Sequence, residues 1–352
     1  DMVARYHQDS PIAAPCDGAR IMASVVEQLS GALAYGHPEV AERLAAAFER
    51  SQPMLVERGN AGCVRRCHGD LHLGNIVLID NVPVPFDALE FSEALATIDV
   101  LYDLAFLLMD LDVRGDRQAA NAVFNAYVAF EPVGGEIEGL ACLPLFLACR
   151  AGVRAVVAMA RTEQLEAAQQ DALRGEIRRN AALAGAYLAP ARPTLIAIGG
   201  LSGTGKSTLA ALLAAHVGAA PGALHVRSDV ERKRLFGVPE TQRLERQHYR
   251  IGTAQRVYSI VEDKARRALD AGHPVIVDAV FAKEDERVAI EAIARDAGCE
   301  FVGLWLAAPA EILIARVEAR RGDASDADRR VVREQLTYDL GNIPWTYVDA
   351  AG

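Results

Sequence analysis

Eight residues, Gly200–Ser207, constrain the fold of this chain more than any other segment. They read Gly-Leu-Ser-Gly-Thr-Gly-Lys-Ser, follow the apolar run Leu195–Ile198 and precede a helix-forming stretch, Thr208–Val217. A G-x-x-x-x-G-K-S pattern between a buried strand and a helix lets backbone N–H groups curl around a phosphate. Its lysine reaches the β- and γ-phosphates, and its serine hydroxyl can ligate Mg²⁺. The sequence therefore predicts a binding site for a nucleoside triphosphate.

We expect this loop to bind ATP through its amides and its polar side chains. A structural glycine-rich turn is the alternative, and the strand and helix on either side of the loop argue against it. Ser207 is also expected to ligate Mg²⁺. The residues expected to contact the nucleotide are Gly200, Ser202, Gly203, Thr204, Gly205, Lys206, Ser207 and Thr208.

Length and composition narrow the class of protein. The chain has 352 residues, enough for two domains, and 51% hydrophobic with 24% charged residues is typical of a soluble globular protein. A net charge of -10 argues against a duplex nucleic-acid partner, which usually meets a basic patch. No uninterrupted run of 18 apolar residues predicts a transmembrane helix, so no membrane partner is expected.

The cysteines and the first residues indicate a cytoplasmic location. No charged start followed by an apolar segment suggests a signal peptide, and the chain begins at Asp1 without a methionine, which favours a truncated fragment. The cysteine spacing suggests no disulfide framework and fits a reducing compartment. The six cysteines are Cys16, Cys63, Cys67, Cys142, Cys149 and Cys299.

The first 187 residues are predicted to be a mostly helical domain. One β-hairpin interrupts the helices, with strands at 76–79 and 82–86 and a turn at Asp80-Asn81. Pro190 and Pro193 then bracket a linker over 188–193, because proline stops a preceding helix. The amphipathic helical segments expected before the linker cover 17–35, 39–57, 96–112, 117–130 and 139–187.

After the linker, the pattern changes to alternating strands and helices, which predicts a three-layer α/β domain over 194–352 with a parallel sheet of about five strands. The expected strands are 194–199, 224–228, 274–278, 301–306 and 345–349. The expected helices are about 206–217, 229–236, 242–271, 284–297, 310–321 and 326–338.

Asp229 follows the second of these strands, where an open parallel sheet binds its ligands. A carboxylate there can orient an acceptor hydroxyl and take its proton, which makes Asp229 the candidate catalytic base. Arg232 lies one helical turn further and is the candidate substrate-binding residue. The alternative is that Asp229 only caps the helix that it precedes.

Asp278 ends the third strand, which is the usual place for a second Mg²⁺ partner beside a phosphate loop. The alternative is an acid that pairs with a nearby base. Arg287, on the following helix, is a candidate for binding substrate or phosphate, although an exposed helical arginine is more often only solvated. Asp278 is therefore predicted as a metal ligand and Arg287 as a substrate-binding residue.

A basic helix followed by a polar turn, 315–326, is typical of a lid. Arg316 and Arg320, four residues apart, can close over the γ-phosphate and stabilise its charge, and Arg316 is the favoured one. The alternative is that both arginines form ion pairs with Glu311 and Glu318. We predict Lys206, Asp229, Arg316 and Arg320 as the catalytic set.

Residues 193–349 resemble the P-loop kinases that include gluconate kinase, zeta-type toxin kinases and polynucleotide kinases. The resemblance rests on Gly200–Ser207, Asp229-x-x-Arg232, Asp278 and Arg316. It implies an enzyme that transfers the γ-phosphate of Mg-ATP to the hydroxyl of a small molecule. Two alternatives stay open, which are a nucleic-acid 5′-hydroxyl kinase and a regulatory ATP-binding protein with vestigial catalysis.

A second motif, Cys67–Asn75, reads Cys-His-Gly-Asp-Leu-His-Leu-Gly-Asn. With Asp87 and the later Asp103-Leu104-Ala105 helix, it resembles the aminoglycoside and choline phosphotransferase family. By that resemblance, Asp70 is a catalytic base and Asn75 and Asp87 bind Mg²⁺. His68 would then brace the loop, and Asp103 would be structural.

This resemblance extends only to the C-lobe of a kinase-like fold. About 66 residues precede the motif, and they contain no Gly-rich loop and no Val-Ala-x-Lys strand of an N-lobe. Either an upstream half is missing, or the C-lobe serves as a scaffold. A zinc site is the competing interpretation, on the loosely zinc-like spacing of Cys63, Cys67, His68 and His72.

Overall fold

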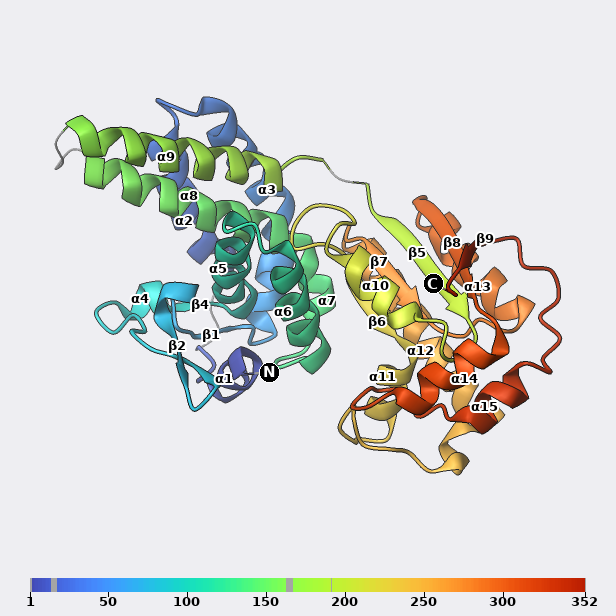
Figure 1. Cartoon of the computed structure of the whole chain (residues 1–352). Coiled ribbons are helices and arrows are strands. Elements are labelled where there is room, and N and C mark those ends of the chain that lie inside the picture. The colour runs from blue at the N-terminus through green and yellow to red at the C-terminus, as the bar shows by residue number, and fades with distance from the viewer. Residues whose placement is uncertain (1, 14–17, 163–166, 191, 352) are drawn as a thin grey trace. The chain divides into compact units, whose positions relative to one another are not determined.

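The computed structural model describes residues 2–13, 18–162, 167–190 and 192–351 (Figure 1). The chain divides into two compact units, Asp1–Ala191 with Ala219–Pro221, and Arg192–Gly218 with Gly222–Gly352. Parts of six predictions lie outside the described residues. These are residue 1 of the first predicted domain, the cysteine at position 16, residue 17 of the helix expected over 17–35, residues 163–166 of the segment 139–187, residue 191 of the linker, and residue 352 of the α/β domain.

The first unit is mostly helical, as predicted, because its apolar residues recur at helical spacing. The expected segment 139–187 forms two long helices that lie side by side, α8 and α9 (Figure 1). The helices of this unit are α1 (Met2–Asp9), α2 (Gly18–Leu33), α3 (Pro38–Asn60), α4 (Glu93–Ala96), α5 (Val100–Val113), α6 (Arg117–Phe130), α7 (Glu136–Gly139), α8 (Leu143–Thr162) and α9 (Ala167–Tyr187), with 3-10 turns η1 (Leu73–Asn75) and η2 (Leu140–Cys142).

Two small antiparallel sheets complete this unit. The predicted hairpin is formed by β2 (Ile76–Ile79) and β3 (Val82–Pro85). Its turn residues, Asp80 and Asn81, both have positive φ, of 50° and 60°, as a two-residue hairpin turn requires. The pairing of β1 (Val64–Arg66) with β4 (Thr97–Asp99) was not predicted, because strands of three residues carry too little alternation to be recognised.

One segment, Glu136–Thr162, is long and apolar enough to cross a membrane by length and composition, with a mean hydropathy of 1.8. Its most apolar window is 67% buried, and the core helix of a soluble protein passes the same test. The segment contains no uninterrupted run of 18 apolar residues, because Arg150 and Arg154 interrupt it, and the sequence alone therefore did not predict it. These two arginines form ion pairs with Asp103 and Asp110 of α5.

The second unit contains a parallel sheet of five strands, as predicted. The strands are β5 (Thr194–Gly200), β6 (Leu224–Arg227), β7 (Val275–Asp278), β8 (Glu300–Ala307) and β9 (Thr346–Asp349), in the order β6-β7-β5-β8-β9. The helices are α10 (Lys206–Ala214), α11 (Ser228–Leu235), α12 (Ile251–Asp270), α13 (Glu284–Asp296), α14 (Ala310–Ala319) and α15 (Arg329–Gln335), with the 3-10 turn η3 (Arg246–Tyr249).

Strand alternation gives this sheet two apolar faces, which is why its central strands are apolar throughout. Ile196 and Ile198 of β5 and Ile276 of β7 pack against Ala210 and Ala214 of α10. Helices α12 and α13 also contact the sheet, so helices lie on both sides of it (Figure 1). The helix expected over 242–271 begins only at Ile251, because the preceding residues form a loop and η3.

Glycine lets an indole ring approach the sheet at β8. Trp345, just before β9, lies against Gly303, where a Cβ atom would collide with the ring, and its ring also lies close to Gly199 of β5. The indole Nε1 donates to Glu291 Oε1 at 2.7 Å, which fixes the ring against α13. Phe281 packs on the same ring edge to face, with centroids 5.1 Å apart.

We therefore expect Gly303→Ala to lower the free energy of unfolding by about 1–3 kcal/mol, the cost of overpacking a filled core. Chemical denaturation of the purified chain measures this change. Gly252→Ala is the matched control, because nothing lies within 4 Å of its added methyl group on α12. Equal stability of the two variants would contradict the packing described here.

Candidate functional site

The phosphate loop connects β5 to α10 through backbone conformations that favour glycine. Gly200, Gly203 and Gly205 have φ of 138°, 90° and 89°. A Cβ atom on Gly203 would lie 2.6 Å from the carbonyl oxygen of Leu313, so only glycine fits there. The amide of Ser202 donates to Gln335 Oε1 at 2.8 Å. The Gln335 side chain of α15 therefore helps to fix the loop, in addition to the loop's own turns.

Lys206, the first residue of α10, carries its ammonium group into the site. Its Nζ donates to the carbonyl oxygen of Leu201 at 3.1 Å. Burial lowers the pKa of Lys206, while the carboxylates of Asp278 and Asp229 act in the opposite direction and Arg320 adds to the lowering. The lysine therefore lies near the carboxylates of Asp278, Asp229 and Asp323 and near one further cation, Arg320.

Asp278 ends β7 beside the phosphate loop and is buried. Burial opposes its ionisation, but the nearby His225 imidazole, the charge of Lys206 and the Ser207 hydroxyl outweigh it and lower the pKa of Asp278. The His225 Nε2 atom lies 3.6 Å from Asp278 Oδ2. The carboxylate is therefore ionised at neutral pH and close to Ser207, which is the donor set that Mg²⁺ prefers.

Asp229 lies in the first turn of α11 and lines the same cleft as Lys206 and Asp278. Burial raises the pKa of Asp229; a hydrogen bond with the Ser325 side chain opposes this, and the charge of Asp278 adds to it. Arg227 is the N-cap residue of α11, so the alternative that Asp229 only caps this helix is wrong.

Arg232 follows on the same helix and is buried beside Tyr249, with its guanidinium carbon 4.8 Å from the ring centroid. Its Nη1 donates to the His248 carbonyl oxygen at 3.4 Å. Its Nε is buried and has no hydrogen-bond partner among the residues that the structure describes. A buried donor without a partner is costly, so this guanidinium can accommodate an anionic or polar ligand.

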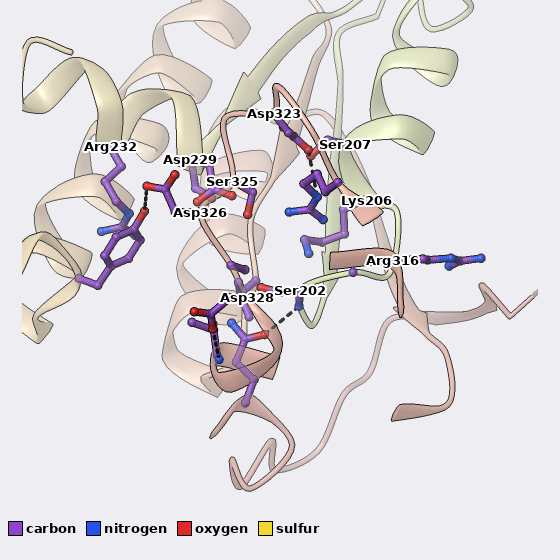
Figure 2. Close-up of a pocket in the computed structure, with 18 of the residues that line it drawn as sticks. Ser202, Lys206, Ser207, Asp229, Arg232, Arg316, Asp323, Ser325, Asp326 and Asp328 are labelled. Atoms are coloured by element: carbon purple, nitrogen blue, oxygen red, sulfur yellow. Dashed lines mark hydrogen bonds and ion pairs between the residues drawn. The ribbon is translucent and has the colours of Figure 1, made fainter. Parts of the chain in front are cut away.

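The two arginines expected in the lid differ. Arg316 Nη1 donates to the Ala350 carbonyl oxygen at 2.7 Å, and its side chain points away from Lys206 (Figure 2). Arg320 has its Nε 3.4 Å from Asp323 Oδ2, and its charge acts on Lys206. The preference for Arg316 over Arg320 was therefore wrong for this conformation, because sequence spacing does not reveal which way a side chain points.

A single cleft of 1080 Å³ connects these groups (Figure 2). Its lining includes Arg316 at the rim and the other candidate residues Lys206, Ser207, Asp229, Arg232, Asp278 and Arg320. The cleft is large enough for a nucleotide and a small second substrate. The loop glycines, with their positive φ, suit the binding of a triphosphate, and the Ser207–Asp278 pair suits Mg²⁺.

Arg287 does not belong to this cleft, so its prediction as a substrate-binding residue was wrong. Its side chain is buried under α13, where Nη1 donates to the carbonyl oxygens of Phe281 and Ala282. Its Nη2 donates to those of Leu340 and Asn342, at 2.6 and 2.9 Å. Arg287 therefore ties three chain segments together in the core.

In the first unit, the structure brings Asp70 and Asn75 together. Asn75 Nδ2 donates to Asp70 Oδ2 and to the Asp70 carbonyl oxygen, each at 3.0 Å, and His72 Nε2 lies 3.5 Å from Asp70 Oδ2. Asp87 is exposed on a left-handed turn with φ of 61°. Within the described ranges, no hydrogen bond joins Asp87 to Asp70 or Asn75.

The backbone ahead of Asp70 is held by Asp103, which is fully buried. Its two oxygens accept from the amides of His68 and Gly69 at 3.1 and 2.8 Å, and His7 Nε2 lies 3.1 Å away. These hydrogen bonds outweigh burial and lower the pKa of Asp103. His68 Nε2 is 2.9 Å from the Phe86 carbonyl oxygen, which connects this loop to the residues around Asp87.

The zinc interpretation was wrong. Cys63 Sγ donates to the Gly134 carbonyl oxygen and Cys67 Sγ to that of Ile98, while His68 bonds Phe86, so these side chains do not converge. In the part of the chain that the structure describes, a different group, His7, Cys67 and Asp103, has ligand atoms close enough to hold a metal. The hydrogen bonds of His7 and Asp103 already account for that buried group.

Comparison with known proteins supports the P-loop assignment. Residues 195–338 match the family described as an AAA domain. The chain is 32% identical over 308 residues to the uncharacterized proteins Rv2004c of Mycobacterium tuberculosis and Mb2027c of Mycobacterium bovis. The match covers 85% of this chain and 59% of each relative, so the chain spans about three fifths of their length.

Among solved structures, the chain is similar to a putative kinase from Chloroflexus aurantiacus (20% identity, TM-score 0.34, 45% of this chain and 89% of that chain). It is also similar to a gluconokinase from Sinorhizobium meliloti, with 20% identity and a TM-score of 0.32 over 46% of this chain and 84% of that chain.

The correction for Arg287 has a measurable consequence. Arg287→Met is expected to lower the free energy of unfolding by about 2–4 kcal/mol, because it leaves buried carbonyl oxygens without donors. Urea denaturation measures this loss. Exposed Arg295 of α13 supplies the control, since Arg295→Met is expected to change stability by less than about 0.5 kcal/mol. An Arg287→Met variant as stable as this control would contradict the structural role.

Proposed function

We propose that this chain is an ATP-dependent kinase whose P-loop domain transfers the γ-phosphate of ATP to a hydroxyl group of a small molecule. The observation that carries this proposal is that Lys206, Asp278 and Asp229 line one cleft, where the pKa of Asp278 is lowered and the pKa of Asp229 is raised. One carboxylate suits a metal ligand and the other a base.

In this proposal, the amides of the phosphate loop and Lys206 bind the β- and γ-phosphates of ATP. Ser207 and Asp278 would hold Mg²⁺, which would offset the negative charge of the phosphates. Asp229 accepts the proton of the acceptor hydroxyl while Arg232 orients the acceptor. Arg320 and, after rotation of its side chain, Arg316 stabilise charge on the transferring phosphoryl group.

A small-molecule acceptor is favoured over a nucleic acid by the net charge of -10. Carboxylates repel a polyanionic backbone. A nucleic-acid 5′-hydroxyl kinase remains the alternative enzyme. A regulatory ATP-binding protein with vestigial catalysis is the alternative without chemistry.

We also propose that residues 1–187 are a C-lobe of the aminoglycoside phosphotransferase type, followed by a linker over 188–193. The hydrogen bonds between Asp70 and Asn75 and the bracing of His68 and Gly69 by Asp103 support this proposal. In it, Asp70 is the base and Asn75 and Asp87 bind Mg²⁺. Asp87 would have to approach Asn75 for that role.

The proposed function predicts different losses in two variants. Lys206→Ala should weaken ATP binding, because it removes the cation that contacts the phosphates. Asp229→Asn should bind ATP normally and lose about 10²–10⁴-fold in kcat, because the base is gone. Phosphoryl transfer from labelled ATP to a metabolite panel, and to a 5′-hydroxyl oligonucleotide, measures both effects.

Arg243→Met is the matched control, since Arg243 lines the outer rim of the cleft and is exposed. Normal phosphoryl transfer by Asp229→Asn would remove the assignment of the base. Label on the oligonucleotide alone would favour the nucleic-acid kinase, and ATP binding without any transfer would favour the regulatory protein.

Turnover should also depend on pH in a way set by Asp229. Its raised pKa means that the carboxyl becomes protonated, and inactive as a base, at a pH above its ordinary value of 3.8. The kcat should therefore fall on acidification while Asp278, with its lowered pKa, is still ionised. A kcat profile that stays flat down to pH 4 would argue against Asp229 as the base.

A further inference from the structure

Arg227 was not among the sequence candidates, yet it connects two parts of the cleft. It ends β6 directly opposite Asp278 in the sheet register, and its Nε lies 3.8 Å from Asp278 Oδ2. Its Nη2 donates to Asp323 Oδ1 at 2.8 Å. One guanidinium therefore spans a carboxylate of the sheet edge and a carboxylate of the segment between α14 and α15.

Asp323 in turn holds Arg320. The second oxygen of the same carboxylate, Oδ2, lies 3.4 Å from Arg320 Nε. Asp323 therefore bridges two guanidinium groups, one from the sheet and one from the lid. All three side chains are mostly shielded from solvent, with exposed fractions of 24% for Arg227, 29% for Asp323 and 23% for Arg320.

Arg320 has a donor left over for a ligand. Its Nη1 is buried and has no hydrogen-bond partner among the described residues, although the side chain lines the same cleft as Lys206. An unpaired buried donor is costly unless a ligand supplies an acceptor. The ion pair at Nε fixes this guanidinium while its far side remains available.

The next residues of the lid are anchored separately. Asp326 Oδ2 accepts from Lys233 Nζ and Tyr249 Oη, both at 2.6 Å, and from the Leu244 amide at 2.9 Å. Lys233 is fully buried. The lid is therefore fixed at Asp326 by α11 and the loop that follows it, whereas its contact with the phosphate end of the cleft runs through Asp323 and Arg227.

We propose that Arg227 is a positioning residue that, through the Asp323 carboxylate, orients Arg320 toward the phosphates of the nucleotide. This inference rests on the proposed phosphoryl transfer. Arginine suits the position because its Nη2 donates to Asp323 while the same planar guanidinium keeps its charge 3.8 Å from Asp278, whereas a lysine ammonium is a single point charge that pairs well with only one of the two carboxylates.

The first experiment measures lid order without any substrate. Trypsin cleavage after Arg320 and Arg321 is followed by mass spectrometry, with cleavage after exposed Arg174 as the internal reference. Arg227→Met should speed the lid cleavage about tenfold, as expected for loss of one charge-assisted hydrogen bond. Arg227→Lys should restore part of the protection. Arg234→Met, which breaks an ion pair within α11, is the control and should change nothing.

The second experiment measures coupling in phosphoryl transfer. Arg227→Met should lower kcat about 10- to 100-fold and change the Kd for ATP by less than about threefold, because it acts through Arg320 rather than on the nucleotide. The double variant Arg227→Met/Arg320→Met should then be no slower than Arg320→Met alone. Arg321→Met is the matched control, since Arg321 is exposed and, among the residues that the structure describes, donates only to backbone oxygens of Glu318 and Arg320.

The two experiments separate this inference from the proposed function. Unchanged lid cleavage in Arg227→Met, or kcat losses of Arg227→Met and Arg320→Met that multiply, would overturn the positioning role even if the chain is a kinase. Faster lid cleavage in Arg227→Met, with no phosphoryl transfer by the unaltered chain, would support the contact and refute the proposed function instead.

Discussion

The cleft depends on the ammonium group of Lys206, which is partly desolvated near the carboxylates of Asp229 and Asp278. Desolvation would favour loss of its proton, and the two carboxylates counter that tendency. The two acids also differ in pKa. The pKa of Asp278 is lowered, which stabilises its ionised form, whereas the pKa of Asp229 is raised. The cleft has buried N–H donors that none of its own acceptors satisfies. The oxygens of a bound triphosphate would supply acceptors for them.

The parallel sheet explains why these groups meet. The carboxyl ends of β5, β6 and β7 supply the phosphate loop, Arg227 with Asp229, and Asp278, because parallel strands all end at one edge. The segment after α14 then covers this edge and is held by Asp323 and Asp326. The chemistry is therefore concentrated where sheet and lid meet, while Arg287 and Trp345 serve the packing behind it.

The sequence was enough to predict the five strands and the phosphate loop, because apolar runs, glycines and the lysine each have a local physical signature. It failed where direction or partners decide, as for Arg287, whose carbonyl partners come from two segments, 281–282 and 340–342, and for Arg316, whose side chain points away from Lys206. His225 and Arg227 alternate with apolar residues on β6 just before Asp229, which is a local signal from which Arg227 can be recognised as a candidate. Gln335 and Ser325 reach the site only through tertiary structure.

Calorimetric titration with ATP, ADP and AMP, each with and without Mg²⁺, measures whether the cleft recognises a triphosphate. We expect affinity to fall from ATP to ADP to AMP and Mg²⁺ to strengthen the binding of ATP most, because in the proposed site Lys206, Ser207 and Asp278 act on the β- and γ-phosphates. Equal affinity for the three nucleotides, or no binding of Mg-ATP, would contradict this expectation.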